Sequence, residues 1–166
     1  MPFRVGLGFD AHAFEEGRRL VLGGVEIPHT SGLAGHSDAD VLTHAVMDAL
    51  LGACGERDIG ENFPDSDPAY TDISSLTLLE EVAGIVGRNG FKIGNIDSVI
   101  LAQEPRLSPY IDDMRRGLAQ VLGISLDAVG VKATTSEGLG FTGRGEGIAA
   151  MAIVFLQSLH GELLQT

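Results

Sequence analysis

Hydrophobic residues first gather near the start of the chain, in an apolar run at residues 3–7 that predicts a buried strand. Two shorter apolar runs follow at residues 20–22 and 25–27, and the second alternates as an edge strand does before it stops at Pro28. A Gly-Gly pair separates these two runs, so the pattern predicts a short hairpin. The charged segment at residues 14–19 is predicted to be a loop.

Three later segments carry apolar residues three and four positions apart, which is the spacing of an amphipathic helix. They begin near residues 39, 74 and 108 and end near residues 53, 89 and 122, with Ser37 or Asp38 as the predicted N-cap of the first. Further strands are predicted at residues 93–103, 129–133 and 148–156. The last strand is almost wholly apolar, which predicts burial on both faces or at a subunit interface.

This order of elements predicts an α/β or α+β domain in which helices are layered on one sheet. We expect a single domain at residues 1–157 and a helical or frayed C-terminal tail at residues 158–166. The segments predicted as loops include residues 31–35, a long acidic stretch at residues 57–68 and a glycine-rich turn at residues 138–147.

The composition narrows the possible partners. The formal net charge is −12, with only 11 Lys and Arg residues, which argues against a general nucleic-acid binder. No apolar run is long enough to span a bilayer, so no membrane partner is expected. The single cysteine, Cys54, allows no internal disulfide, and the first strand leaves no room for a signal peptide; both favour the cytoplasm. Any phosphate ligand would depend on metal ions, backbone N–H groups, hydroxyls or a few placed cations.

Asp10 and His12 follow the first strand and are two residues apart, so their side chains point to the same side of an extended segment. Carboxylate and imidazole are both ligands of zinc, and His44, on the first predicted helix, is the best candidate for a third. We therefore predict a zinc site at Asp10, His12 and His44 with one open position. Asp40 and Asp48 lie one turn before and after His44, and Asp48 is the preferred partner to orient its ring. An ordinary turn contact at the strand end and a solvated acidic helix face are the alternatives.

A second polar cluster, Thr134-Thr135-Ser136-Glu137, ends the strand at residues 129–133. Its hydroxyls and backbone N–H groups suit phosphate oxygens, and its carboxylate suits magnesium. An ordinary Ser/Thr turn with a capping acid explains the same residues, and the residues alone favour that interpretation.

Taken together in order, six motifs resemble the motif set of the 2-C-methyl-D-erythritol 2,4-cyclodiphosphate synthase family of the non-mevalonate isoprenoid pathway. They are Phe9-Asp10-Ala11-His12, Gly35-His36-Ser37-Asp38-Ala39-Asp40, Asp58-Ile59-Gly60, Phe63-Pro64-Asp65-Ser66-Asp67, Lys132-Ala133-Thr134-Thr135 and Gly140-Phe141-Thr142-Gly143-Arg144-Gly145-Glu146-Gly147. Each motif is weak alone, but the ordered set covers nearly the whole chain.

The resemblance implies a homotrimer of ferredoxin-like subunits, with active sites at the subunit interfaces. It implies a cyclising phosphorus–oxygen lyase that converts 4-diphosphocytidyl-2-C-methyl-D-erythritol 2-phosphate to the 2,4-cyclodiphosphate plus CMP. One zinc ion per subunit would be held by Asp10, His12 and His44, and Glu137 would carry magnesium or manganese. His36 and Thr135 would position and polarise the phosphates.

The resemblance also implies the substrate contacts. The methylerythritol part would face Asp58, Ile59, Gly60, Phe63, Pro64, Asp65, Ser66 and Asp67, and Ser37 would also contact the substrate. The cytidine and its phosphate would contact Ala102, Gln103, Glu104, Pro105, Arg106, Leu107, Ser108, Thr134 and Ser136 of a neighbouring subunit. Phe141 and Arg144 would lie near the ligand and the threefold axis, where a central cavity could hold an isoprenoid diphosphate.

Small departures from the family pattern concern only the nucleotide contacts, such as Ser136 where Thr is commoner and Arg106 where Lys is also found. Two other functions fit parts of the pattern. A zinc phosphoesterase would use the same three ligands with a metal-activated water. A trimeric isoprenoid-diphosphate binder would use Arg144 but would not need the zinc cluster.

Overall fold

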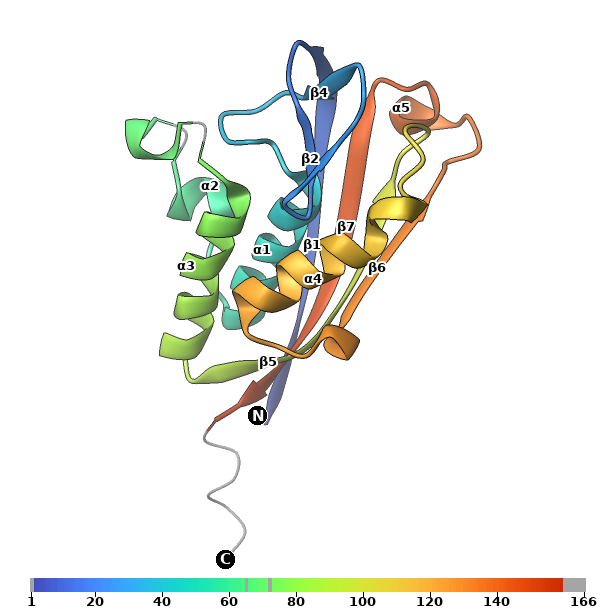
Figure 1. Cartoon of the computed structure of the whole chain (residues 1–166). Helices are drawn as coiled ribbons and strands as arrows, with labels where there is room; N and C mark the ends of the chain where they lie inside the picture. The colour runs from blue at the N-terminus through green and yellow to red at the C-terminus, as the bar shows by residue number, and fades with distance from the viewer. Residues whose placement is uncertain (1, 65, 72, 160–166) are drawn as a thin grey trace, which may run out of the picture.

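The computed structural model describes residues 2–64, 66–71 and 73–159 and shows one five-stranded sheet with helices on one face (Figure 1). The strand order is β4-β1-β7-β5-β6, formed by β4 (Ser31–Leu33), β1 (Phe3–Glu16), β7 (Gly147–Ser158), β5 (Phe91–Leu101) and β6 (Val129–Thr134). The pairings are antiparallel except for β5 with β6. The predicted mixed α/β class with helices layered on one face is confirmed.

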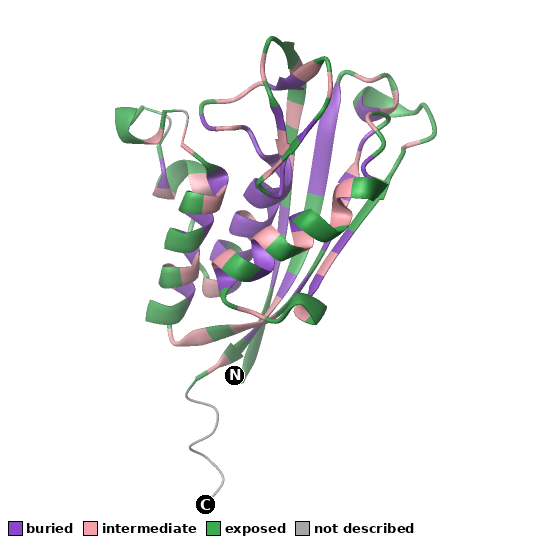
Figure 2. Ribbon diagram, viewed as in Figure 1, coloured by how far each residue is buried: buried purple, intermediate pink, exposed green. Residues whose placement is uncertain are grey.

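Three long helices form the second layer: α1 (Val41–Cys54), α3 (Ser75–Arg88) and α4 (Ile111–Leu122). All three were predicted, and α3 and α4 end where expected, at Arg88 before Asn89 and at Leu122 before a left-handed Gly123. The hairpin of β2 (Leu20–Leu22) and β3 (Val25–Ile27) was also predicted and forms a separate two-stranded sheet. Figure 2 shows that α1 is the most completely buried helix, between the sheet and the other two helices.

The start of α1 differs from the prediction, because neither Ser37 nor Asp38 caps it. Asp40 is the N-cap, and its side chain accepts a 3.0 Å hydrogen bond from the backbone N–H of Thr43. The same fully buried carboxylate accepts hydrogen bonds from the Thr43 hydroxyl and from the backbone N–H groups of Gly23 and Gly24. Asp40 therefore joins α1 to the β2–β3 turn, which explains an acidic side chain in the core.

The first strand is longer than predicted and faces the other way. It continues to Glu16, and its last residues pair with β4, in the segments predicted as loops. Its buried face carries Gly6 and Gly8, because a Cβ on either would lie 1.9 Å from a backbone oxygen of α1. The large apolar residues at the odd-numbered positions of this strand point away from the helices, with 48 to 61% of their surface exposed: Phe3, Val5, Leu7 and Phe9.

Several short elements were missed because they span one turn or a few residues and carry no periodicity. Besides β4, they are α2 (Ile59–Asn62), α5 (Gly140–Gly143) and the 3₁₀ turns at Pro68–Tyr70, Ser108–Tyr110 and Leu126–Ala128. The first 3₁₀ turn ends the acidic stretch predicted as a loop. The C-terminal tail was predicted to begin at residue 158, but Ser158 is still the last residue of β7. Residues 160–166 lie outside the described part of the chain.

Burial along β7 matches only part of the prediction for the last strand. Its helix-side residues are buried, whereas Met151 and Ile153 on the other face are 38 and 52% exposed in the single chain. Among the described residues, no helix is long and apolar enough to cross a membrane.

Candidate metal site and substrate pockets

Three predicted ligands meet at one point between the sheet and α1. Asp10 and His12 project from β1 toward the helix layer, and His44 comes from the first turn of α1. Asp10 Oδ2 lies 2.8 Å from His12 Nε2 and 2.9 Å from His44 Nδ1, and the two ring nitrogens are 3.2 Å apart. The structure therefore forms the predicted three-residue cluster, which could hold a metal ion.

The dimensions of this cluster suit a small divalent cation. A tetrahedral zinc ion with bonds of about 2.0–2.1 Å has ligand atoms about 3.3 Å apart. The observed edges of 2.8, 2.9 and 3.2 Å are slightly shorter, so a modest opening of the side chains would give that geometry. Three protein ligands leave the fourth position open toward a pocket, which is the arrangement of catalytic rather than structural zinc sites.

The remaining nitrogen of each histidine is also engaged. His12 Nδ1 lies 2.5 Å from the backbone oxygen of Ala34, so Nδ1 donates and Nε2 faces the cluster. His44 uses its nitrogens in the opposite sense, because Nε2 lies 3.0 Å from Ser75 Oγ and 3.2 Å from Ser37 Oγ. Such outer contacts orient metal-binding imidazoles.

These contacts differ from the sequence prediction that Asp48 orients His44. Both nitrogens of the His44 ring are directed to other residues, and the Asp48 carboxylate accepts a 2.9 Å hydrogen bond from the Ile59 backbone N–H instead. Asp40 is equally removed from this role, because its oxygens serve the α1 N-terminus and the hairpin turn. Asp48 thus positions α2, and Asp40 positions α1.

In the metal-free cluster, an Asp10 carboxyl with a lowered pKa lies beside a His12 imidazole with a raised pKa. Burial acts to raise the pKa of the Asp10 carboxyl, but its hydrogen bonds and charge interactions with His12 and His44 outweigh burial and hold that pKa well below its usual range. Burial acts to lower the pKa of His12, but the contacts with Asp10 and the Ala34 carbonyl outweigh it and raise that pKa. A bound cation would have to displace the proton that His12 binds.

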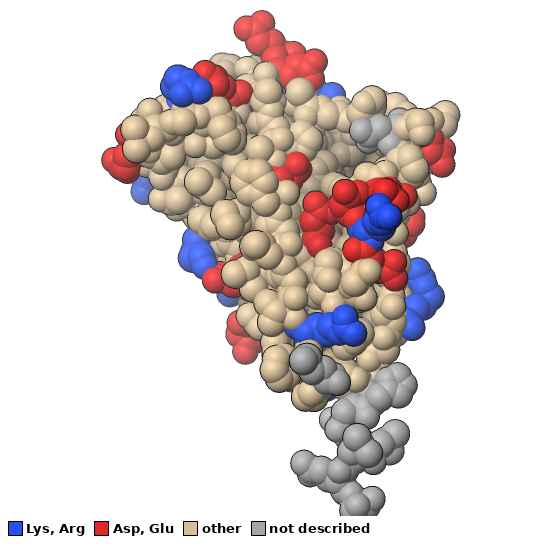
Figure 3. Space-filling model, turned by 180° about the vertical axis from the view of Figure 1, so that it is seen from behind, with Lys and Arg blue, Asp and Glu red and all other residues tan. Residues whose placement is uncertain are grey.

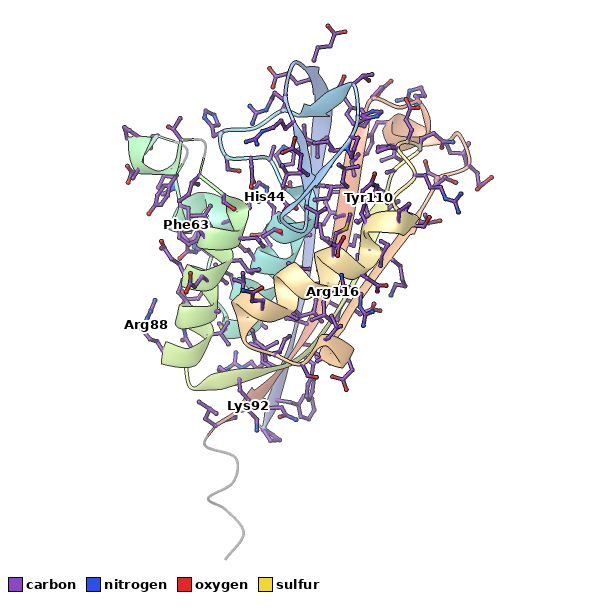
Figure 4. All side chains as sticks on the ribbon, in the orientation of Figure 1. His44, Phe63, Arg88, Lys92, Tyr110 and Arg116 are labelled. Atoms are coloured by element: carbon purple, nitrogen blue, oxygen red, sulfur yellow. The ribbon has the colours of Figure 1, made fainter. Side chains whose placement is uncertain are left out.

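The cluster lines a pocket of about 200 Å³ between α1, α2 and α3. Of the predicted residues, His36, Ser37, Ile59, Gly60 and Phe63 share its wall. Figure 4 shows His44 on α1 and Phe63 beside the upper end of α3. Tyr70 and Leu78 also line the pocket and were not predicted, although the Phe63 and Tyr70 rings meet edge to face with centroids 5.5 Å apart.

The other residues predicted to face the methylerythritol part follow this pocket along the chain. Asp58 caps α2 by accepting a 3.0 Å hydrogen bond from the Glu61 backbone N–H. Asp67 caps the next 3₁₀ turn, and Pro64 and Ser66 are exposed between them. Asp65 lies outside the described residues.

The side chain of Arg18 stabilises the loop that carries His36. Arg18 donates hydrogen bonds of 2.8 and 2.7 Å to the backbone oxygens of Gly35 and Ser37, one on each side of His36. The guanidinium group therefore holds the residues on both sides of His36 through one rigid fork of donors. Sequence reasoning missed Arg18 because its partners are backbone atoms.

A second pocket, of about 460 Å³, lies where β5 and β6 end. It is lined by Ala102, Gln103, Pro105, Arg106, Leu107, Ser108, Ile111, Ala133, Thr134 and Thr135, which brings together most of the residues predicted to contact cytidine. Glu104 is exposed beside them.

The Thr/Ser cluster extends from this pocket. The Thr135 hydroxyl donates a 2.7 Å hydrogen bond to Glu137, and Ser136 contacts Thr142 of α5. Phe141 is 39% exposed, and Arg144 forms a two-point ion pair with Glu146 at 2.7 and 3.1 Å.

Strand register gives the separation of the two pockets. Asp10 pairs with Ala150, Ala150 with Ile100, and Ile100 with Ala133, so one row crosses the sheet from the metal cluster to the second pocket. Three strand spacings amount to about 14 Å. In a single chain the two pockets are therefore distinct.

Comparison with known proteins identifies the family. The family model described as the YgbB family matches residues 3–157. A 2-C-methyl-D-erythritol 2,4-cyclodiphosphate synthase from Syntrophomonas wolfei is 62% identical over 154 residues, covering 93% of this chain and 98% of the relative. The Bacillus subtilis enzyme of the same name is 57% identical over 155 residues, covering 93 and 98%.

The fold comparison agrees with the sequence comparison. The solved structure of Plasmodium falciparum IspF in complex with CDP matches with a TM-score of 0.82 and 31% identity, covering 95% of this chain and 97% of that one. With this fold, the ordered motifs and identities of this size over almost the full length, the chain belongs to the YgbB family of 2-C-methyl-D-erythritol 2,4-cyclodiphosphate synthases.

Proposed function

We propose that this chain is a 2-C-methyl-D-erythritol 2,4-cyclodiphosphate synthase. In the reaction, an oxygen of the substrate's 2-phosphate forms a bond to the diphosphate phosphorus that carries methylerythritol. The bridging P–O bond breaks, and CMP leaves with the electron pair. The observation that carries the proposal is the convergence of Asp10, His12 and His44 on one pocket in a chain 62% identical to an enzyme of that name.

Zinc is the cation proposed for this cluster, because two imidazoles, one carboxylate and an open position form a typical catalytic zinc site. Asp10, His12 and His44 would hold it. When bound, a divalent cation supplies positive charge for the phosphate oxygens, which this acidic chain otherwise lacks.

His36 and Thr135 are proposed to orient the phosphates by hydrogen bonding. No strong base is required, because a phosphate monoester is already largely ionised at neutral pH. The work of the protein is then positioning and charge stabilisation, which dominate phosphoryl transfer. The attacking and leaving groups belong to one bound molecule. A substrate bound in the right conformation therefore needs little further motion to reach the transition state.

The pocket beside the cluster is proposed to hold the methylerythritol part. Its walls combine apolar side chains, Ile59 and Phe63, with polar groups at Ser37 and Gly60. An apolar wall suits the methyl branch, and the polar groups suit hydroxyls. Asp58 and the segment 63–67, with Pro64, Asp65, Ser66 and Asp67, would close over the same part of the ligand.

The larger second pocket is proposed to bind the cytidine and its phosphate. In support, the fold neighbour from Plasmodium falciparum is a CDP complex. Glu137 would carry magnesium or manganese at the diphosphate. Because about 14 Å separates the two pockets within one chain, the nucleotide pocket of a neighbouring subunit is proposed to complete each active site.

A homotrimer would supply that neighbouring pocket. The sheet face opposite the helices exposes Phe3, Val5, Leu7, Phe9, Met151 and Ile153. Figure 3 shows the molecule from behind, where much of the surface carries no charged side chain. An apolar face of this kind is typical of a subunit interface. Three copies would also bring Arg144 and Phe141 together around an axis, where we propose an isoprenoid diphosphate could bind.

The proposed compartment is the cytoplasm, since a single cysteine suits a reducing environment.

Product analysis tests the proposed function. The purified protein is given the diphosphocytidyl substrate with zinc and magnesium, and ³¹P NMR follows the phosphorus species. Equal amounts of a cyclic diphosphate and CMP are expected. A linear product with inorganic phosphate would instead identify a phosphoesterase and overturn the proposal. His29→Ala is the matched control for the cluster variants His12→Ala and His44→Ala. His29 lies outside the cluster and packs on Phe14, with ring centroids 5.3 Å apart.

A further inference from the structure

We propose that Ser136 and Thr142 are positioning residues, which hold Thr135 in place for its role at the phosphates. Their hydroxyl oxygens lie 2.8 Å apart and join the turn after β6 to α5. The family resemblance implied instead that Ser136 contacts the nucleotide, and Thr142 entered only as part of a motif. The inference rests on the function proposed above for Thr135.

The side chain of Ser136 is turned inward, whereas its neighbours in the chain are turned outward. Residues 132–135 and 137–141 are exposed, but Ser136 is half-buried and Thr142 is only 5% exposed. Of the described residues that line the second pocket, Thr134 and Thr135 come from this cluster and Ser136 does not. The Ser136 hydroxyl therefore contacts the protein and not the pocket.

The hydrogen bonds inside the turn have one consistent direction. The backbone oxygen of Leu139 can only accept, so the Ser136 hydroxyl, 2.7 Å away, donates its single proton there. Ser136 Oγ is then the acceptor for the Thr142 hydroxyl. Thr142 is therefore the donor that ties α5 to the turn.

The turn needs this support because part of its backbone is unfavourable. Glu137 and Gly138 have φ angles of 53° and 79°, and the left-handed region is disfavoured for a residue with a Cβ such as Glu137. A conformation of this kind persists where the surrounding structure holds it. The helix α5 also touches the turn directly, because a Cβ on Gly143 would lie 2.3 Å from the backbone carbonyl carbon of Gly138. A displacement of α5 would therefore move the turn.

The two residues with proposed roles at the diphosphate stand on either side of Ser136 and contact each other. The Thr135 hydroxyl donates a 2.7 Å hydrogen bond to the Glu137 carboxylate, and the Glu137 backbone N–H donates to Thr135 Oγ1 at 3.3 Å. With Ser136 fixed inward, both side chains are directed outward. Loss of the bond between Ser136 and Thr142 is expected to loosen this arrangement, and catalysis by positioning is sensitive to such a displacement.

An isosteric pair of variants isolates the hydroxyl of Thr142. Thr142→Val removes the hydroxyl and nearly keeps the side-chain volume, and Thr142→Ser keeps the hydroxyl and removes the methyl group. Thr77→Val is the matched control, because it makes the same change at an exposed position of α3. The values of kcat and KM are measured with the diphosphocytidyl substrate at saturating zinc and magnesium. Hydrogen exchange of the Leu139 amide, which donates to the Ser136 backbone oxygen at 2.9 Å, is measured without substrate or metal.

We expect Thr142→Val to lower kcat about tenfold or more with little change in KM, because substrate still binds but Thr135 is misplaced. Exchange at Leu139 should be faster in the same variant. Thr142→Ser should recover most of both, and Thr77→Val should match the unmodified protein. An unchanged kcat in Thr142→Val would overturn the proposal even if exchange were faster, since the hydroxyl would then be only structural. A Thr142→Ser variant as impaired as Thr142→Val would overturn it too, because the methyl group would be responsible.

Ser136→Ala separates positioning from nucleotide contact. A residue that acts only through the turn should give the same loss of kcat as Thr142→Val, and the double variant should be no worse than either single one. Calorimetry with CDP and magnesium should then give the same affinity for all three variants and the unmodified protein. Weaker CDP binding in Ser136→Ala alone would place Ser136 on the ligand and overturn its assignment. An unmodified protein that makes no cyclic product would refute the proposed function, whereas normal turnover with unchanged kcat and exchange in Thr142→Val would refute this inference alone.

Discussion

Asp10 Oδ2 and His44 Nδ1 lie 2.9 Å apart although the two residues are 34 positions apart in the chain. Their contact exists because α1 packs directly on β1, where Gly6 and Gly8 leave no side chain in the way. The metal cluster is therefore a product of close helix–strand packing as much as of its ligand residues.

Removal of either histidine of the cluster is expected to abolish turnover without dissociating the oligomer. His12→Ala or His44→Ala leaves two ligands, which hold zinc weakly, while the outward face of the sheet is unchanged. Metal analysis and size-exclusion chromatography check this. Full zinc occupancy in both variants would contradict the site, and His29→Ala should behave as the unmodified protein.

Zinc affinity is expected to fall as the pH is lowered, and to begin falling above the ordinary histidine pKa of about 6.5. The reason is that contacts with Asp10 and Ala34 raise the pKa of His12 against the opposing effect of burial, and zinc must displace the proton that His12 binds. Below that raised pKa the affinity should drop about tenfold per pH unit, as expected for one displaced proton. Chelator competition between pH 5.5 and 8.5, roughly the range where histidine titrates, measures it; constant affinity across this range would refute the coupling.

Gly8→Ala is expected to destabilise the fold by about 3 kcal/mol or more, because overpacking at backbone contact forces β1 away from α1. The added Cβ would lie 1.9 Å from the Ala45 backbone oxygen. Gly52→Ala is the matched control, since a Cβ there meets nothing within 4 Å and a helical Gly→Ala change stabilises by about 0.5–1 kcal/mol. Chemical denaturation of the metal-free proteins gives both values; equal stabilities would contradict the packing argument.

Arg18→Ala is expected to lower kcat about tenfold or more while zinc content stays full. Arg18 holds the backbone oxygens on both sides of His36, so its loss frees a residue proposed to orient the phosphates. Arg19→Ala provides the comparison, because Arg19 pairs with Glu26 on the exposed surface. Equal kcat values for the two variants would remove Arg18 from this role.

Glu137→Gln is expected to weaken the magnesium dependence of turnover more than the zinc content. A neutral amide is a poorer magnesium ligand than a carboxylate, and Glu137 lies outside the zinc cluster. Turnover is titrated with magnesium at saturating zinc. A titration that matches that of the unmodified protein would show that Glu137 does not carry the ion.

Local pattern was enough for much of the fold and for the three metal ligands. The two-residue spacing of Asp10 and His12 places both on one side of a strand wherever that strand lies, and helical spacing placed His44 on α1. The residues that hydrogen-bond to the ring of His44 on the side away from the cluster could not be predicted in this way. Ser75 begins a helix 31 residues after His44, so only the packing of α3 on α1 brings its hydroxyl to the ring, in place of the predicted Asp48.

The sequence by itself determined the order of the long helices and main strands, the ligand types and the family, because periodicity and motif order are local properties. Tertiary structure decided which face of β1 is inside. An apolar run predicts burial, but the backbone of α1 approaches so closely that only Gly6 and Gly8 fit beneath it, and Phe3, Val5 and Leu7 are left facing outward. The physical reason is that close packing selects for the shape of a residue before its hydrophobicity.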